Sequence, residues 1–383
     1  MNSIHDYVRY ETRRQFFARG KNALGYAALA SLLGPSLSKL WGAESAGVSG
    51  AILPHFPAKV KNIIYLHMVG GPSQMDLFDY KPVMADWYDK DLPDSIRMGQ
   101  RLTTMTSGQK RFPIAPSKFK FEQVGSTGMW MNTELLPMTA KCVDDMAFIR
   151  SMHTEAINHE PAILHMQTGS MVPGKPCIGS WASYGLGSMN ENLPTFVVLV
   201  AEPTNKEQIQ AISARLWSSG FLSGEHAGVS FRSKGDPILF INNPPGVPDH
   251  LRRTQLDGLR ALNELNYAQI GDPETHTRIQ QFEMAYRMQS SVPELTDMSG
   301  EPESTYKLYG DEAKKPGTYA YNVLLARRLV ERGVRFVQLF HGGIGSAGAW
   351  DSHRDIRKNH ERLTKQVDQP IAALIKDLKQ RGM

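Results

Sequence analysis

A short apolar run that ends in two glycines is the feature of this sequence that most limits its fold. Residues 61–69 are nearly continuous in apolar side chains, and Gly70 and Gly71 follow directly. A run of this length bounded by turn residues is typical of a strand buried on both faces of a parallel sheet. Paired glycines permit a tight turn at its end, because glycine lacks the Cβ that restricts other residues. The chain is therefore expected to contain a parallel sheet covered by helices.

Strand-like and helix-like segments alternate along the rest of the chain. Further strands are predicted at residues 146–150, 194–200, 228–231, 238–241 and 334–340. Helices are predicted at residues 134–144, 159–168, 249–290, 319–331 and 353–381. Residues 80–135 and 291–316 are predicted to be irregular. This alternation predicts an α/β fold, a three-layer α/β/α sandwich with a mostly parallel sheet.

The first residues of the chain have the pattern of an export signal. Arg13 and Arg14 precede an aromatic pair, and the weakly apolar stretch at 22–33 is short for a membrane span but suits a signal peptide. Small residues at 43–46 provide a cleavage site. An ordinary amphipathic helix with two chance arginines is the alternative.

Domain organisation and location follow from that signal. Residues 1–46 are predicted to be a twin-arginine signal peptide and linker, and residues 47–383 one α/β domain. We expect the twin-arginine translocase to export the chain to the periplasm or another extracytoplasmic space. No transmembrane span is expected in the mature chain.

Charge and cysteine content exclude several classes of protein. The formal net charge is +5, but residues 1–46 hold six Lys/Arg against three Asp/Glu, so the remainder carries only +2. No basic patch with interleaved aromatic residues occurs, so no nucleic-acid partner is predicted. Cys142 and Cys177 are too few for a disulfide framework; they either pair with each other or are two small buried side chains.

Two polar clusters follow predicted strands. Ser73 and Asp76 come after the first strand, and Asp351 and His353 come after the strand at 334–340. The carboxyl ends of parallel strands meet at one edge of a sheet, where open α/β sheets bind ligands, so the four residues are expected to converge. A carboxylate and an imidazole two residues apart can bind a metal such as zinc. The structural alternative is that the Ser and Asp residues cap helices.

A third polar group follows the predicted strand at 146–150 and contains His153, His159 and His165. The six-residue spacing from His159 to His165 does not place both on one helix face, which argues against a zinc-protease motif. Packing histidines are the alternative. The sequence also lacks a phosphate-binding loop, a G-x-G-x-x-G that opens a helix after the first strand, and a G-x-S-x-G nucleophile turn.

These residues belong to motifs that resemble a known family. The motifs are residues 70–82, 151–154, 158–162, 179–181 and 350–353. They resemble the bacterial sulfatase-like family called domain of unknown function 1501, of the alkaline phosphatase superfamily, over most of residues 60–383. The resemblance implies an alkaline phosphatase-like α/β/α sandwich with a divalent metal (zinc, calcium or manganese) at the strand ends. It also implies hydrolysis of sulfate or phosphate esters of small molecules or glycans.

The resemblance also implies roles for individual residues. Asp351 and His353 match a later pair of metal ligands in the family. Ser73 stands where many relatives have a metal-binding Asp, for which Asp76 is the expected substitute.

The implied catalytic group is Thr154, Asn158 and His159. Asn158 stands where relatives carry a serine, so the identity of the nucleophile stays open. The hydroxyls of Ser151 and Thr154 are the nearby alternatives, and the sequence does not choose between them.

The end of the sequence also departs from the family. Relatives continue after the last helix with a strand, a Glu-Phe-Gly-Arg motif and a His-containing motif, whereas this sequence ends at Met383. The sandwich is thus expected to lack its last strand or strands and the site to bind metal weakly or not at all. The expected function is an exported, metal-dependent hydrolase-like protein of the sulfatase or phosphatase type that is a poor or inactive enzyme as it stands. The alternative is a catalytically silent extracytoplasmic binding or surface protein that retains the fold.

Overall fold

The computed structural model describes residues 59–99, 106–201, 212–232, 234–342, 350–353 and 355–383. The described chain divides into two compact units. The smaller contains Asn242–Tyr286 with the few described residues before Asn62, and the larger contains Asn62–Ile241 and Arg287–Met383. The predicted signal peptide lies outside the described residues.

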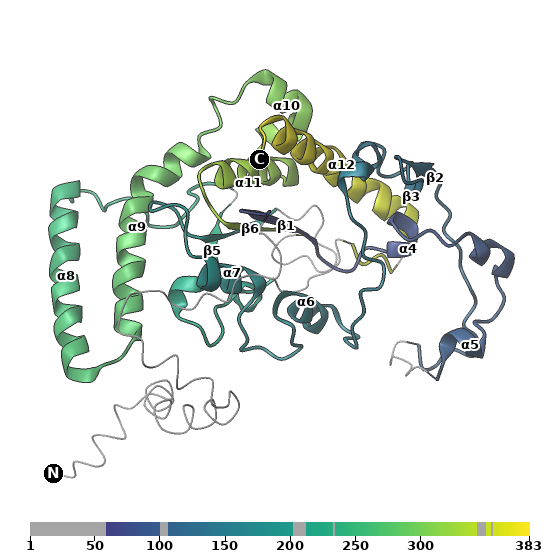
Figure 1. The fold of residues 1–383 in the computed structure, drawn as a ribbon, viewed down its shortest axis with the longest axis horizontal. Coiled ribbons are helices and arrows are strands. Elements are labelled where there is room, and N and C mark those ends of the chain that lie inside the picture. The colour runs from purple at the N-terminus through teal and green to yellow at the C-terminus, as the bar shows by residue number, and fades with distance from the viewer. Residues whose placement is uncertain (1–58, 100–105, 202–211, 233, 343–349, 354) are drawn as a thin grey trace, which may run out of the picture. The chain divides into compact units, whose positions relative to one another are not determined.

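A four-stranded sheet forms the centre of the larger unit (Figure 1). Its strands are β1 (Ile63–Met68), β4 (Phe196–Val200), β5 (Val229–Phe231) and β6 (Phe336–His341), in the order β1-β6-β4-β5. All three pairings are parallel. β6 lies between β1 and β4 and is buried at every residue, and its sequence is apolar except at Gln338 and His341. The predicted parallel sheet is confirmed.

Helices cover both faces of this sheet (Figure 1). α6 (His159–Thr168) and α7 (Ile178–Leu186) lie on one face, and α11 (Tyr319–Glu331) and α12 (Ile356–Gln380) lie on the other. Alternate strand residues point to opposite faces, so those on the α6 side form one core with a leucine of that helix: Phe196, Val198, Phe336, Phe340 and Leu164. The chain therefore has a mixed α/β fold with helices on both faces of a parallel sheet.

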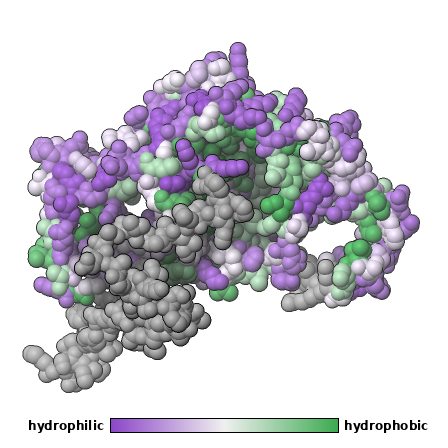
Figure 2. All heavy atoms as spheres, viewed as in Figure 1, coloured by the Kyte–Doolittle hydropathy of each residue, from purple (hydrophilic) through white to green (hydrophobic). Residues whose placement is uncertain are grey.

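α12 shows why its sequence forms a long covering helix. Its buried face contains Leu363, Val367 and Leu374, spaced four and seven residues apart. In the view of Figure 2, hydrophilic side chains cover the surface over α10 (Glu303–Tyr309) and α12. The apolar face thus packs inward while the charged face meets water.

Two of the predicted strands are wrong. Residues 146–150 and 238–241 form no strand. Phe148 instead packs its ring 6.4 Å from that of Phe78, beside a small separate core. Phe240 is 96% exposed. Short apolar runs do not define a strand unless a neighbouring strand is available to pair with them.

A small hairpin follows the first strand of the sheet. β2 (Phe121–Val124) pairs antiparallel with β3 (Met129–Asn132), within a segment predicted to be irregular. A 3-10 helix, η4 (Thr139–Asp145), lies where an α-helix was predicted at 134–144. The short helices of this region and of the connections near β5 are α4 (Gln74–Leu77), η3 (Pro82–Trp87), α5 (Asp94–Arg97), η5 (Ala214–Trp217) and η6 (Gly224–His226).

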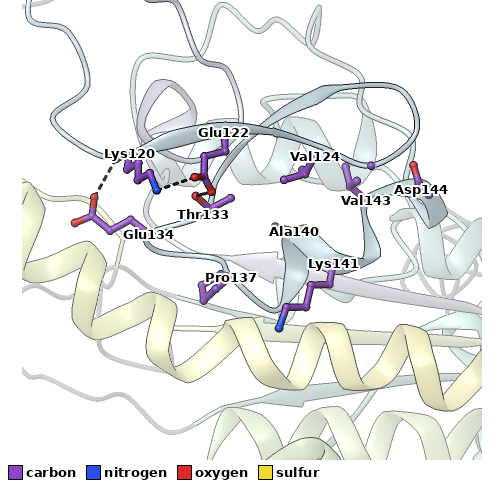
Figure 3. A pocket seen from close by; sticks show the side chains of 11 residues that line it. Lys120, Glu122, Val124, Thr133, Glu134, Pro137, Ala140, Lys141, Val143 and Asp144 are labelled. Atoms are coloured by element: carbon purple, nitrogen blue, oxygen red, sulfur yellow. Dashed lines mark hydrogen bonds and ion pairs between the residues drawn. The ribbon is translucent and has the colours of Figure 1, made fainter.

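A cavity of about 720 Å³ lies between this hairpin and η4 (Figure 3). Its polar lining is largely paired within itself. Glu122 accepts from the hydroxyl of Thr133 at 2.7 Å and forms an ion pair with Lys120 at 2.6 Å. The cavity therefore presents few free charged groups to a ligand.

The smaller unit contains a pair of helices, as the sequence predicted for residues 249–290. They are α8 (Asp249–Ile270) and α9 (Glu274–Thr296), of which the last part belongs to the larger unit. Arg253 donates two hydrogen bonds to Glu283, at 2.7 and 3.0 Å, which link the two helices.

The predicted loop at 291–316 is wrong in part. It contains the end of α9, α10 and a 3-10 helix, η7 (Asp311–Lys314). Leu295 and Tyr309 are fully buried, which fixes these short helices against the core. The segment is mostly polar, so its sequence did not indicate that Leu295 and Tyr309 would be buried.

Candidate functional site

The candidate site begins at the turn after β1. Ser73 precedes α4, but its hydroxyl does not cap that helix and instead donates to Asp76 Oδ2 at 2.7 Å. Gly71 has a φ of +69°, a conformation that favours glycine, and a Cβ there would lie 3.6 Å from the ring of His159. The end of β1 therefore brings Ser73 and Asp76 together and places the turn against α6.

The segment after β6 returns to the same edge of the sheet. The backbone N–H of Trp350 donates to the carbonyl oxygen of Val69 at 3.2 Å, so this segment is hydrogen-bonded to the end of β1. Asp351 and His353 follow at once. The expected convergence of the two strand ends is therefore visible in the backbone.

His159, Asp351 and His353 form what we call the His–Asp–His site. His159 Nε2 and His353 Nε2 each lie 2.7 Å from Asp351 Oδ2. The side chains are partly open to solvent, at 28% for His159, 20% for Asp351 and 53% for His353. One carboxylate thus joins imidazoles from two distant parts of the chain.

His360 of α12 is a site neighbour that the sequence analysis missed. The backbone N–H of Ser73 donates to its Nε2 at 3.4 Å, which places the ring proton on Nδ1, 3.2 Å from Ser352 Oγ. Burial lowers the pKa of His360, and the negative charge of Asp76 opposes that shift. His360 therefore bridges the β1 turn and the segment that carries Asp351. Its place three residues before Leu363 and seven before Val367, on the buried face of α12, is the sequence signal that could have identified it.

Two residues of the implied catalytic group make only local contacts. Asn158 is the N-cap of α6, where its side-chain oxygen accepts from the N–H of Glu160 at 3.3 Å. Thr154 is exposed and accepts from the N–H of Ala156 at 3.1 Å. The strand expected to position Thr154 does not form. Of Thr154, Asn158 and His159, the structure joins only His159 to Asp351 and His353.

The donor set of the His–Asp–His site suits zinc, which is bound in catalytic sites by three nitrogen or oxygen ligands with one position open. Across the described ranges, however, no group of three or more His, Cys, Asp or Glu side chains is already arranged as a metal site. Both imidazoles contact the same oxygen, His159 through a hydrogen bond and His353 at ion-pair distance. The residue types fit a metal, while the side chains are positioned for direct contact with one another.

The cysteines and the helices bear on two further features of the chain. Cys142 and Cys177 are both buried and unpaired, so they are small core side chains. In the part of the chain that is described, none of the helices has both the length and the apolar character needed to cross a membrane.

Comparison with known protein families matches residues 60–383 to a family model described as protein of unknown function (DUF1501). The chain belongs to the DUF1501 family. No curated protein and no solved structure gave a significant match. Ser73, Asp76, His159, Asp351 and His353 all lie within the matched part of this DUF1501 chain.

Proposed function

We propose that this DUF1501 protein is a metal-dependent hydrolase of sulfate or phosphate esters, with an alkaline phosphatase-like fold. The observation that carries the proposal is the meeting of His159, Asp351 and His353 at the carboxyl edge of a parallel sheet. Ligands of open α/β sheets bind at that edge. Two imidazoles and a carboxylate are also a ligand set that zinc uses in hydrolases.

In this proposal the three side chains hold one divalent cation. The cation would polarise the ester oxygen and offset the charge that develops on it. The Nε2 atoms of both imidazoles already lie around Asp351 Oδ2, so a cation would have to replace these direct contacts and separate the three donors by its own radius. His159 lies on the first turn of α6, which a cap at Asn158 holds in place.

We propose Ser73 as the nucleophile, because its hydroxyl is paired with a carboxylate at the same strand end. Its proton is donated to Asp76 Oδ2 at 2.7 Å, the arrangement of a hydroxyl beside a carboxylate that can accept its proton. The N–H of Ser73 contacts His360, which limits the conformations of the turn. Asp76 then has the role of base, and the metal ligands are the three residues of the His–Asp–His site.

The test uses the 383-residue chain with added zinc, manganese or calcium against p-nitrophenyl phosphate and p-nitrophenyl sulfate. The sequence predicted a poor or inactive enzyme, but the meeting of His159, Asp351 and His353 leads us to expect metal-dependent hydrolysis of one ester. Asp351→Asn and Ser73→Ala should each abolish it. Asp86→Asn, the same change at an exposed position, should leave hydrolysis unchanged. Hydrolysis that persists in Asp351→Asn, or that needs no metal, would contradict the proposal.

A second function is favoured by a separate observation, the side chain of Asn158 acting only as a helix cap. A binding or surface protein that retains the fold needs no nucleophile there. The same assay separates the two: a chain that binds zinc through Asp351 but hydrolyses neither ester is a binding protein.

We further propose that the chain is exported through the twin-arginine route, on the strength of Arg13 and Arg14. Changing both to Lys should leave the precursor in the cytoplasm. Cell fractionation measures this, with Arg9→Lys as a matched control that should be exported normally. Normal export of the double variant would remove the basis for this location.

A further inference from the structure

The indole of Trp350 is held between two buried histidines. Trp350 is 1% exposed, and its Nε1–H donates to His341 Nδ1 at 2.8 Å. Its ring packs edge to face against the ring of His341, at a centroid distance of 5.6 Å, and against the ring of His360, at 5.7 Å. Trp350 thus has a hydrogen bond and two ring contacts that fix its orientation.

The protonation state of His341 allows its Nδ1 to accept that hydrogen bond. It lies at the end of β6, and burial lowers its pKa to about 4, so the ring is neutral near neutral pH. Its Nε2 lies 3.2 Å from Gln366 Oε1, which only accepts, so the ring proton is on Nε2. Nδ1 is then unprotonated and faces the indole N–H. Tyr319 packs on the same ring, with centroids 4.8 Å apart.

Asp351 follows Trp350 directly in the chain. The backbone of Trp350 is bonded to Val69, and its side chain is bonded to His341. Asp351 and His353 are more exposed; the side chain of Asp351 contacts His159 and His353. Two neighbours therefore hold this segment: the buried Trp350 before Asp351, and Ser352, whose hydroxyl accepts from Asn359 Nδ2 at 2.6 Å.

We propose that His341 is a positioning residue for the candidate site: it holds Trp350, and through Trp350 it sets the place of Asp351 and His353. The inference rests on the proposed function where metal binding is its readout. Groups that orient metal ligands typically change metal affinity about 10- to 100-fold when they are removed. Because His341 touches neither a metal nor a substrate, its effect should appear in affinity and in the order of the 350–353 segment.

The test compares three variants of the full chain by zinc titration against a competing chelator. His341→Phe keeps an aromatic ring but removes the acceptor, and zinc affinity should fall about tenfold or more. His341→Asn keeps an acceptor near the position of Nδ1 and should recover most of the affinity. Val337→Ala, on the same strand, removes buried volume without touching Trp350 and should lower stability but leave zinc affinity unchanged.

A second readout needs no metal. The indole N–H of Trp350, assigned with Trp350→Phe, should exchange slowly with solvent in the wild type and in His341→Asn, and fast in His341→Phe. The amide of Trp350 should follow the same order. If the wild type binds no zinc through Asp351, the proposed function fails, yet these exchange rates still decide the inference. Equal indole exchange in His341→Phe and wild type, or an equal loss of zinc affinity in Val337→Ala, would overturn it.

Discussion

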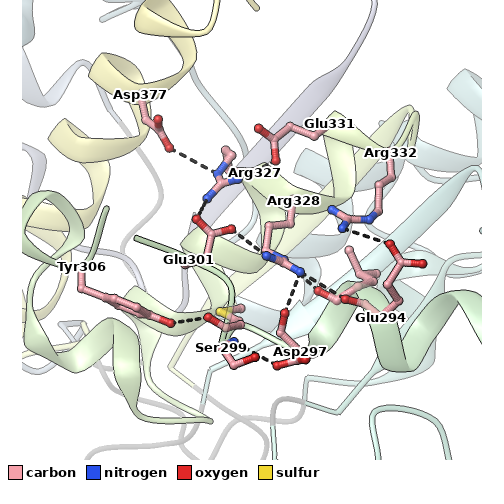
Figure 4. Close-up of polar contacts among 12 residues, drawn as sticks. Glu294, Asp297, Ser299, Glu301, Tyr306, Arg327, Arg328, Glu331, Arg332 and Asp377 are labelled. Carbon is pink, nitrogen blue, oxygen red and sulfur yellow. Dashed lines mark hydrogen bonds and ion pairs between the residues drawn. The ribbon is translucent and has the colours of Figure 1, made fainter. Parts of the chain in front are cut away.

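Two clusters of oppositely charged or ionisable side chains in this protein differ in how far they are exposed to solvent. The arginine cluster contains Arg327, Arg328, Glu301, Glu331 and Asp377, and joins α11 and α12 to the segment before α10 (Figure 4). The His–Asp–His site lies at the strand ends. Arg327 has 2% of its side chain exposed, whereas His353 has 53%. Four members of the arginine cluster expose at most 9% of their side chains and Glu331 at its edge exposes 21%, whereas every member of the His–Asp–His site exposes 20% or more.

The arginine cluster shows what a stabilising charge network requires. Burial disfavours the charge of Arg327, but hydrogen bonds to Glu301 and Glu331 outweigh this and raise its pKa. Burial also disfavours the charge of Glu301, yet the two arginines hold its pKa below the usual range. Each ion is thus neutralised by several others. A ligand has no access to them, so this cluster serves the fold.

The His–Asp–His site is assembled differently. Its carboxylate is shared by two imidazoles, and all three side chains reach solvent. Little folding energy depends on such contacts, since partly exposed ion pairs are worth about 1 kcal/mol or less. The comparison teaches that burial, more than residue type, separates a structural charge cluster from a candidate site.

The largest expected effect is in the arginine cluster. Arg327→Met should destabilise the protein by about 3–5 kcal/mol, because it leaves Glu301 and Asp377 buried without their full compensation. Urea unfolding followed by circular dichroism measures the loss. Arg332→Met is the control, since Arg332 is 32% exposed with one pair at 3.7 Å, and should cost less than about 1 kcal/mol. Equal losses in the two variants would mean that burial does not distinguish them.

A pH effect of intermediate size should come from two buried histidines, His67 and His341. Burial lowers the pKa of each to about 4, below the value near 6.5 of the unfolded chain. Above pH 6.5 both histidines are neutral in the folded and the unfolded state, so their contribution to the free energy of unfolding does not change with pH. Stability should then fall as the pH drops from 6.5 to 4, because only the unfolded state takes up the protons, by about 3 kcal/mol per histidine.

Substitution of His341 separates its part of this pH-dependent loss of stability from that of His67. In His341→Asn, the loss of stability between pH 6.5 and 4 should be smaller than in the wild type by about 3 kcal/mol. Urea midpoints at four pH values in this window give the comparison. Parallel pH profiles would show that His341 does not stay neutral in the folded protein.

The smallest effect on stability is expected at the candidate site. His159→Ala should change the free energy of unfolding by less than about 1 kcal/mol, because its ion pair with Asp351 is partly exposed. Zinc affinity should nevertheless fall strongly in this variant. A stability loss as large as that of Arg327→Met would show that His159 stabilises the fold as the arginine cluster does, and would contradict the distinction drawn between the two clusters.

The sheet was predictable from sequence where strands are buried on both faces. β4 is a continuous apolar run, and β1 and β6 are mostly apolar. α11 has a clear helical period that ends before Gly333. Residues 146–150 misled because Phe148 uses its apolar surface against Phe78 instead of a neighbouring strand. Tertiary packing decides such short runs, and the local pattern does not contain it.

The site was predictable only in part for the same reason. Asp351 and His353 follow a recognisable strand, so their place at the sheet edge follows from topology. His360 and His341 look like a helix residue and a turn residue, and only the packing around Trp350 gives them their contacts. Asn158 was assigned a catalytic role from the resemblance to relatives, although Asn directly before a predicted helix is also a common N-cap, which is its role in the structure.

The most direct test of this account is to locate the metal. Crystals of the full chain soaked in zinc should show an anomalous peak at the zinc edge bound by His159, Asp351 and His353, with zinc–nitrogen distances of about 2.0–2.1 Å. Crystals of Asp351→Asn should lack this peak while they keep the same fold. Zinc bound elsewhere, or no zinc at these three residues under conditions that give hydrolysis, would contradict the central claim.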